Sequence, residues 1–171
     1  MRWKKVTLVG VGLLGGSLGL ALKKRRLASE VAGFVRRAGS VEECKRLGAV
    51  DFATQDLSVA VEGADLVVLC TPLAQMKGLV RLMAPSLRRG SVVTDVGSVK
   101  GSVVRQLEGI IGKAGAHFVG SHPMAGAEKM GVTAAKANLF EHAICVVTPA
   151  RSSNKAAVGK VERLYSNSAQ E

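Results

Sequence analysis

The sequence predicts one α/β domain with a doubly wound, mainly parallel β-sheet, and three observations lead to this prediction. A length of 171 residues suits a single domain, and 47% apolar residues are enough for a sizeable buried core. Short apolar runs alternate with segments of helical periodicity along most of the chain. The first apolar run leads directly into a glycine-rich turn, which is typical of a dinucleotide-binding, Rossmann-like sheet.

The turn follows a strand predicted over residues 6–9 and matches the pattern G-x-G-x-x-G. In that pattern the first glycine makes the tight turn, the second lets the backbone approach a pyrophosphate, and the third lets the helix pack on the strand. The helix that follows directs its free N–H groups and its positive dipole end at the phosphates. The alternative is a purely structural turn. The predicted cofactor-binding residues here are Gly10, Gly12, Leu13, Leu14 and Gly15.

The end of the second strand, predicted over residues 30–35, indicates which nucleotide is bound. A site that prefers NAD has Asp or Glu about 20 residues past the glycines, where the carboxylate binds the ribose 2′-hydroxyl. This chain has Val35 there, followed by Arg36 and Arg37. Two guanidinium groups with no nearby acid favour a 2′-phosphate, so we expect NADP over NAD. The alternative is that both arginines only form a solvated turn.

The remaining elements alternate in the same way. Helices are predicted over 40–47, 57–63, 76–87, 98–111 and about 152–165, and strands over 48–53, 64–70, 91–95, 116–120 and within 142–149. Thr71 follows the most apolar strand, so it is expected near the nicotinamide end of the cofactor, unless Thr71-Pro72 merely ends the strand. Ser98 occupies a predicted N-cap position, which does not exclude a second role for its hydroxyl.

The segment 121–128 is predicted to be a loop at the carboxyl end of the sixth strand, where loops often carry chemistry. His122 lies in it among small residues that leave room for a substrate. The alternative is a structural histidine. The three histidines and three cysteines lack the spacing of a metal site or a disulfide framework, so no metal is expected and the cysteines are expected to be buried thiols.

The net charge of +11 allows nucleic acid, an anionic membrane surface or anionic small molecules as partners. The basic residues are spread over many segments with few aromatic residues among them, which favours anionic small ligands over nucleic acid. No apolar run approaches the roughly 18 residues of a membrane span, and the basic N-terminus leads into the first strand and not into a signal peptide. A cytoplasmic location without membrane contact is therefore expected.

Three motifs in order, at 10–18, 95–100 and 120–128, resemble the prephenate/arogenate dehydrogenase family over nearly the whole chain. The first motif is shared with many dinucleotide-binding proteins, whereas the second and third together are specific. The resemblance implies an oxidoreductase of tyrosine biosynthesis that oxidises a ring C4 alcohol with NADP and releases the ring carboxylate as CO2. By the same resemblance His122 is the base, Ser98 orients the C4 hydroxyl, and Glu128 is an acid with a gating or surface role.

The family also implies a helical domain that dimerises and supplies basic residues for the substrate carboxylates. We expect residues 1–171 to form the NADP-binding domain alone, with a homodimer only for the longer family members. The alternatives are a noncatalytic NADP-binding module, a β-hydroxyacid dehydrogenase relative, which shares the first motif only, and a nucleic-acid binder. The residues that choose between prephenate and arogenate are expected outside this segment.

Overall fold

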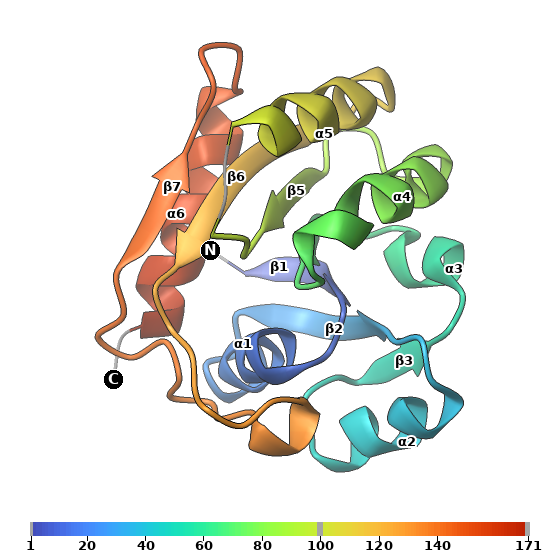
Figure 1. Ribbon diagram of the computed structural model, residues 1–171, viewed down its shortest axis with the longest axis vertical. Coiled ribbons are helices and arrows are strands. Elements are labelled where there is room, and N and C mark those ends of the chain that lie inside the picture. The colour runs from blue at the N-terminus through green and yellow to red at the C-terminus, as the bar shows by residue number, and fades with distance from the viewer. Residues whose placement is uncertain (1, 99–100, 170–171) are drawn as a thin grey trace.

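A computed structural model describes residues 2–98 and 101–169, and it confirms the predicted doubly wound sheet (Figure 1). The strands of this part of the chain are β1 (Trp3–Val9), β2 (Ala28–Phe34), β3 (Phe52–Thr54), β4 (Leu66–Leu69), β5 (Val92–Asp95), β6 (His117–Pro123) and β7 (Cys145–Thr148). They form one sheet in the order β3-β2-β1-β4-β5-β6-β7. Neighbouring strands are parallel except for β6 and β7, which are antiparallel.

Helices cover both faces of the sheet, each over its own hydrophobic core. They are α1 (Leu13–Lys24), α2 (Ala38–Arg46), α3 (Leu57–Val61), α4 (Leu73–Met83), α5 (Ser102–Lys113) and α6 (Lys155–Ala169), with the short 3-10 helices η1 (Ala84–Ser86) and η2 (Val132–Ala134). Apolar residues of α1, α2 and α6 share one core, and those of α3, α4 and α5 share the other. Because both faces are covered, the central strand β4 is buried at every position, as its uniformly apolar sequence predicts.

The strand order reverses between β1 and β4, which are direct neighbours in the sheet. The crossovers on the two sides of this point go to opposite faces, so the loops after β1 and β4 separate and leave a crevice at the carboxyl ends of the strands. Ligands of open α/β sheets bind at such a reversal. The fold therefore places the glycine turn and the Cys70–Thr71 segment at one crevice.

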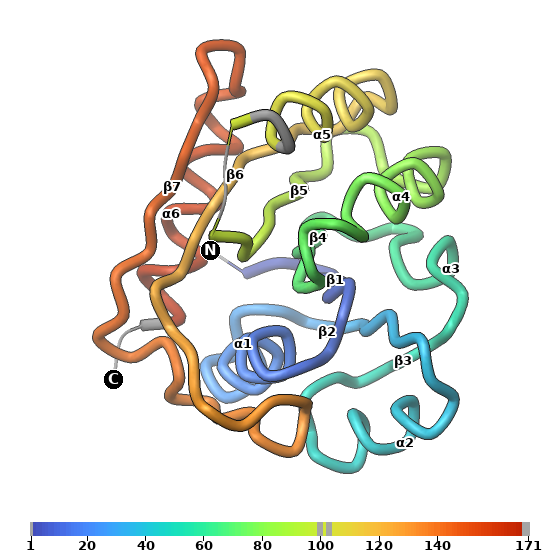
Figure 2. Tube along the Cα trace, viewed as in Figure 1, coloured from blue at the N-terminus to red at the C-terminus, as the bar shows by residue number. Residues whose placement is uncertain are grey.

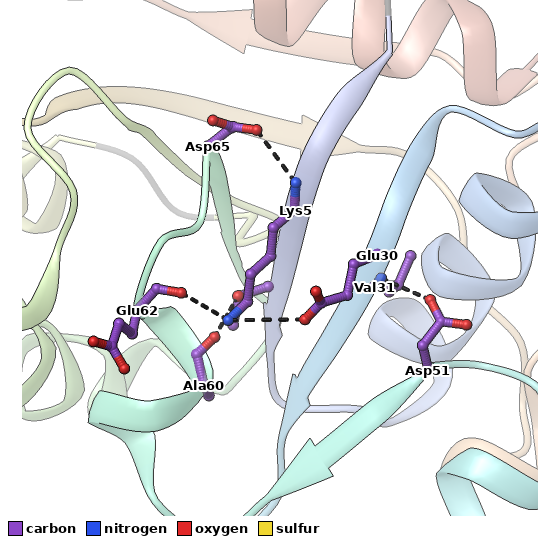
Figure 3. A network of polar contacts seen from close by, with 8 residues as sticks. Lys5, Glu30, Val31, Asp51, Ala60, Glu62 and Asp65 are labelled. Atoms are coloured by element: carbon purple, nitrogen blue, oxygen red, sulfur yellow. Dashed lines mark hydrogen bonds and ion pairs between the residues drawn. The ribbon is translucent and has the colours of Figure 1, made fainter.

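The opposite edge of the sheet is held by polar contacts between side chains and backbone (Figure 3). The Lys5 ammonium donates to the Glu62 carbonyl at 2.7 Å, and the Val31 N–H donates to the Asp51 carboxylate at 2.8 Å. Slightly further along β1, the buried Thr7 hydroxyl donates to the Ala60 carbonyl at 2.6 Å. These bonds tie β1 to α3 and the residue after it, and β2 to the residue before β3, away from the crevice.

Several predicted boundaries are wrong. The strand predicted over 48–53 is shorter, because only Phe52–Thr54 pair with β2. The helix predicted over 76–87 begins earlier, at Leu73, directly after Pro72. It also ends earlier, at Met83, and the 3-10 helix η1 follows, because Pro85 has no N–H to donate to a helical hydrogen bond. The closing helix predicted over 152–165 starts later and continues to Ala169, with its predicted apolar stripe against the sheet.

Two corrections concern candidate site residues. Ser98 does not cap a helix, because α5 begins at Ser102 and its N-cap is Gly101, whose φ of 94° suits glycine. His122 does not lie in a loop, because β6 extends to Pro123 by pairing with β7. Val99 and Lys100, the end of the 95–100 motif, lie outside the described residues. Within the described residues no helix is both long and apolar enough to cross a membrane.

Candidate active site

A cavity of about 870 Å³ opens at the carboxyl ends of β1, β4, β5 and β6. Its wall contains nine of the predicted site residues, which come from five separate segments of the chain: Gly10, Gly12, Leu13, Leu14, Arg36, Arg37, Thr71, Ser98 and His122. The size suits a dinucleotide together with part of a small substrate, since ligand sites generally measure roughly 300 to 1,000 Å³. The predicted cofactor and catalytic residues thus share one space.

The glycine turn has the geometry that its sequence predicts. Gly10 has a φ of 97°, which allows the tight turn. A Cβ atom on Gly12 would meet nothing within 4 Å, so this position opens into free space. Gly12 is also the N-cap of α1, where no side chain bonds the free N–H groups and no acid lies in the first turn. The start of α1 is therefore available to an anionic group.

Gly15 has a packing role and does not belong to the cavity wall. A Cβ atom there would lie 2.1 Å from the Gly10 carbonyl oxygen, which is far inside van der Waals contact. Gly19, one turn further on α1, is equally restricted, since its Cβ would lie 2.0 Å from the Ala49 carbonyl oxygen. Gly15 lets α1 lie against the backbone of the glycine turn, and Gly19 lets it lie against Ala49, so Gly15 supports the cofactor site indirectly.

Thr71 stands beside the glycine turn, as the reversal of strand order requires. A Cβ atom on Gly10 would lie 2.8 Å from Thr71 Cγ2. Thr71 lines the cavity. Its hydroxyl group is buried and has no hydrogen-bond partner among the described residues. Buried hydroxyl groups are normally bonded, so this one is suited to a polar atom of a bound ligand. At the neighbouring Cys70, burial and secondarily the charge of Asp95 raise the thiol pKa to about 12.

The end of β2 forms the basic wall of the cavity. Val35 is buried, whereas Arg36 and Arg37 are exposed and border the cavity together with Ser40. Gln55 donates to the Arg36 carbonyl at 2.6 Å and so holds the backbone of this turn. Arg37 is the N-cap of α2, whose first turn contains no acid and no capping side chain. The start of α2 and two guanidinium groups thus place positive charge at this wall. Ser40 was not among the site residues predicted from the sequence.

Ser98 follows the end of β5, and His122 lies near the end of the neighbouring strand β6. Ser98 is exposed and follows Gly97 beyond the end of β5. His122 is half-buried in β6, and its Nδ1 atom is buried without a partner among the described residues. Since both residues line the cavity, a substrate hydroxyl there could contact the histidine and the serine together.

Glu128 is exposed and does not belong to the cavity wall, although its neighbours Ala127 and Met130 do. The segment from 124 to 131 leaves β6 and continues past α1 to η2 (Figure 2). It is anchored there by the Lys136 N–H, which donates to the buried Ser17 hydroxyl at 2.9 Å. Met130, which sequence reasoning also missed, is 79% exposed and contributes an apolar edge to the cavity.

Cys70 lines the cavity, whereas Cys44 and Cys145 do not. Among residues 2–98 and 101–169, no group of three His, Cys, Asp or Glu side chains could hold a metal ion. None of the three cysteines takes part in a disulfide. Cys44 is buried, but Cys70 and Cys145 are half-buried, so the prediction of full burial is wrong for these two. Cys70 follows β4 and lines the cavity, and Cys145 lies in the edge strand β7.

Comparison with known proteins agrees with this geometry. The family described as prephenate dehydrogenase, nucleotide-binding domain, matches residues 18–169. Prephenate dehydrogenase of Bacillus subtilis (strain 168) is 34% identical over 160 residues, which cover 93% of this chain and 43% of the relative. The match therefore spans less than half of that relative's length.

Two solved structures have the same fold. Prephenate dehydrogenase from Aquifex aeolicus, in complex with hydroxyphenyl propionate and NAD+, is 31% identical with a TM-score of 0.91, and the match covers 99% of this chain and 58% of that one. Arogenate dehydrogenase from Synechocystis is 30% identical with a TM-score of 0.88, and the match covers 97% and 58%. In each case the chain corresponds to somewhat more than half of the solved protein.

Proposed function

Because the chain belongs to the prephenate dehydrogenase family through its nucleotide-binding domain, we propose that it supplies the NADP site and the catalytic base for oxidative decarboxylation of prephenate or arogenate. This reaction would give 4-hydroxyphenylpyruvate or tyrosine, so the chain would serve tyrosine biosynthesis. The observation that carries the proposal is the shared cavity, in which the glycine turn and His122 face one space.

In the proposed reaction, His122 takes the proton of the C4 hydroxyl while the C4 hydrogen leaves as hydride. A neutral imidazole can accept a proton near neutral pH, and the buried Nδ1 atom has no hydrogen-bond partner in the part of the chain that the structure describes. Ser98 would hold the hydroxyl in line with the imidazole. The bound nicotinamide would accept the hydride. The bond from C1 to the carboxylate then breaks, its electron pair completes the aromatic ring, CO2 leaves, and the phenolate oxygen recovers a proton.

The cofactor site fits a dinucleotide with a 2′-phosphate. Gly12 and the uncapped start of α1 suit the pyrophosphate, and the buried Thr71 hydroxyl suits a polar group toward the nicotinamide end. Arg36, Arg37 and the start of α2 suit the additional phosphate, because charge-assisted bonds are the stronger ones and the first turn of α2 contains no carboxylate. The Aquifex aeolicus relative holds NAD+, which makes NAD the alternative cofactor.

Five further features belong to this proposal. The substrate is a small anionic molecule, and the protein acts in the cytoplasm. We also propose that residues 1–171 constitute one nucleotide-binding domain and that the longer family members dimerise through a different part of the chain. Glu128, exposed beyond the cavity wall, would act at the cavity entrance.

The test measures nucleotide binding and turnover separately. Isothermal titration calorimetry of the chain with NADP and NAD should give a lower Kd for NADP. Turnover is measured as NADPH formation with prephenate and with arogenate, in the chain and in a chimera that continues after Ala169 with the remaining part of the Bacillus subtilis relative. NADP binding with turnover only in the chimera would support the proposal. NADP binding with no turnover in a folded, substrate-binding chimera would indicate the noncatalytic module, and equal affinity for both nucleotides would refute the NADP preference.

A further inference from the structure

Strand β6 changes its pairing partner just before His122, which lines the same cavity as Ser98. Its parallel pairing with β5 ends at the pair Thr94 and Val119, and from Gly120 onward it pairs with β7 instead. The backbone ladder therefore does not connect β5 to the part of β6 that carries His122. Other bonds must hold Ser98 and His122 at a constant separation.

The Asp95 carboxylate supplies two such bonds. It is 2% exposed, and one oxygen accepts from the Gly97 N–H at 2.9 Å while the other accepts from the Ser121 N–H at 3.1 Å. Gly97 directly precedes Ser98, and Ser121 directly precedes His122. One buried carboxylate thus bonds the peptide groups next to both candidate residues.

The Ser121 hydroxyl reinforces the connection. It lies 2.5 Å from the Asp95 carbonyl oxygen, 2.9 Å from the Thr94 hydroxyl and 3.0 Å from the Tyr165 hydroxyl. A hydroxyl has one proton and accepts two bonds, and the carbonyl can only accept. Ser121 therefore donates to the Asp95 carbonyl, and Thr94 and Tyr165 donate to Ser121.

Tyr165 brings α6 into this network. The residue is 5% exposed, and α6 packs against β6. Burial raises the Tyr165 pKa well above its ordinary value, so the hydroxyl stays protonated and continues to donate. Neither Tyr165 nor Asp95 lines the cavity, and their hydrogen bonds to Ser121 and Gly97 connect them to the residues next to His122 and Ser98.

We propose that Asp95 and Tyr165 are positioning residues, which set the place of His122 relative to Ser98 through the backbone of Ser121 and Gly97. This inference rests on the proposed function of His122 and Ser98. It also implies that a displacement of α6 changes the orientation of the imidazole while the nucleotide site, on the other side of the crevice, keeps its geometry.

The experiment compares Tyr165→Phe with the matched control Thr7→Val. Each variant removes one buried hydroxyl bond, but Thr7 of β1 bonds the Ala60 carbonyl of α3, on the face of the sheet that α6 does not cover. The readouts are the NADP Kd, Tm and the imidazole ¹H and ¹⁵N resonances of His122 in the chain. These resonances are assigned by their loss in His122→Asn, and the chain contains only three histidines.

We expect Tyr165→Phe to broaden or split the His122 resonances and Thr7→Val to leave them unchanged, at similar losses of Tm and with an unchanged NADP Kd in both. In the chimera, Tyr165→Phe should lower kcat about tenfold at unchanged KM for NADP, as expected for a lost buried hydrogen bond. Asp95→Asn should have a larger effect in the same direction, because its amide would face a backbone N–H.

Two outcomes would overturn the positioning role of Tyr165 and leave the proposed function of His122 and Ser98 unaffected. One is a single, unshifted set of His122 resonances in Tyr165→Phe with NADP still bound, and the other is an equal disturbance in Thr7→Val. Failure of the proposed function would give a different result. The unaltered chain would then not bind the nucleotide, or the His122→Asn chimera would have the parent kcat.

Discussion

The two sides of the cavity are built in different ways. On the nucleotide side, the turn between β1 and α1 depends on glycines, which carry no side chain. Gly15 has no room for a Cβ atom, and Gly12 leaves space open. On the side of His122, the end of β5 and β6 depends on side chains that are present, namely Asp95 and Ser121 with their buried hydrogen bonds.

The difference decides how each side responds to change. A backbone turn shaped by glycine is disturbed by almost any added atom, since the atoms around it belong to the main chain. A side-chain network is disturbed by the loss of one polar group, which leaves its buried partner without a bond. Substitutions on the two sides should therefore separate stability, nucleotide affinity and turnover.

The largest effect is expected at His122. In the chimera, His122→Asn should lower kcat by roughly 10² to 10⁴, because it retains a hydrogen-bonding group but loses the basic nitrogen. The NADP Kd of the chain should not change. His117→Asn, at the other end of the same strand, is the control and should keep the parent kcat. Parent turnover in His122→Asn would show that the histidine is structural.

The next effect tests the glycine turn with a matched pair. Gly12→Ala should keep the parent Tm, since its methyl group meets no protein atom, but should raise the NADP Kd about a hundredfold through lost bonds to the pyrophosphate. Gly15→Ala should instead lower the free energy of unfolding by about 3 kcal/mol or more, because the methyl group overlaps the Gly10 carbonyl. Calorimetry and thermal denaturation measure the two quantities. Unchanged NADP binding in Gly12→Ala would contradict a pyrophosphate at this turn.

A smaller effect is expected for nucleotide preference. Replacing Arg36 and Arg37 together by Ala should reduce the preference for NADP over NAD by roughly ten- to a hundredfold, because each exposed guanidinium gives a partly screened bond to the 2′-phosphate. Affinity for NAD should remain. The adjacent pair Arg88 and Arg89, at the amino end of β5, is the control because its removal changes the charge equally. An equal loss in the control would indicate a general charge effect.

The smallest effect is expected for Ser98→Ala in the chimera, where kcat should fall about tenfold through loss of one orienting hydrogen bond. Tm should stay at the parent value, because Ser98 is exposed and does not cap α5. A clear loss of Tm with unchanged kcat would assign the serine a structural role instead.

Much of the nucleotide side could be predicted from the sequence. The function of the glycine turn could be predicted from the identity and spacing of Gly10, Gly12 and Gly15. The basic pair Arg36 and Arg37 follows a strand whose end could be predicted from the local sequence pattern. Gly19, by contrast, is required only because Ala49 of a distant turn approaches α1. Local pattern does not report such a contact.

The other side shows the limit of local pattern. His122 and Ser98 were predicted as site residues, but one was placed in a loop and the other at a helix cap. Pairing with β7, a strand more than twenty residues later in the sequence, makes His122 part of β6, and Gly101 delays the start of α5. The motifs at 95–100 and 120–128 include Asp95 and Ser121, but the hydrogen bonds of these residues and of Tyr165 could not be predicted, because a buried polar residue is informative only when its partners are known.

The sequence by itself determined the alternation of strands and helices, the glycine turn and the basic end of β2, because apolar periodicity and glycine spacing are local properties of the chain. Only the tertiary structure decided which segments share the cavity and which side chains hold them there. The Asp95 carboxylate and the Tyr165 hydroxyl meet Ser121 from β5 and α6, and contacts between residues so far apart form only when the sheet and its helices have assembled.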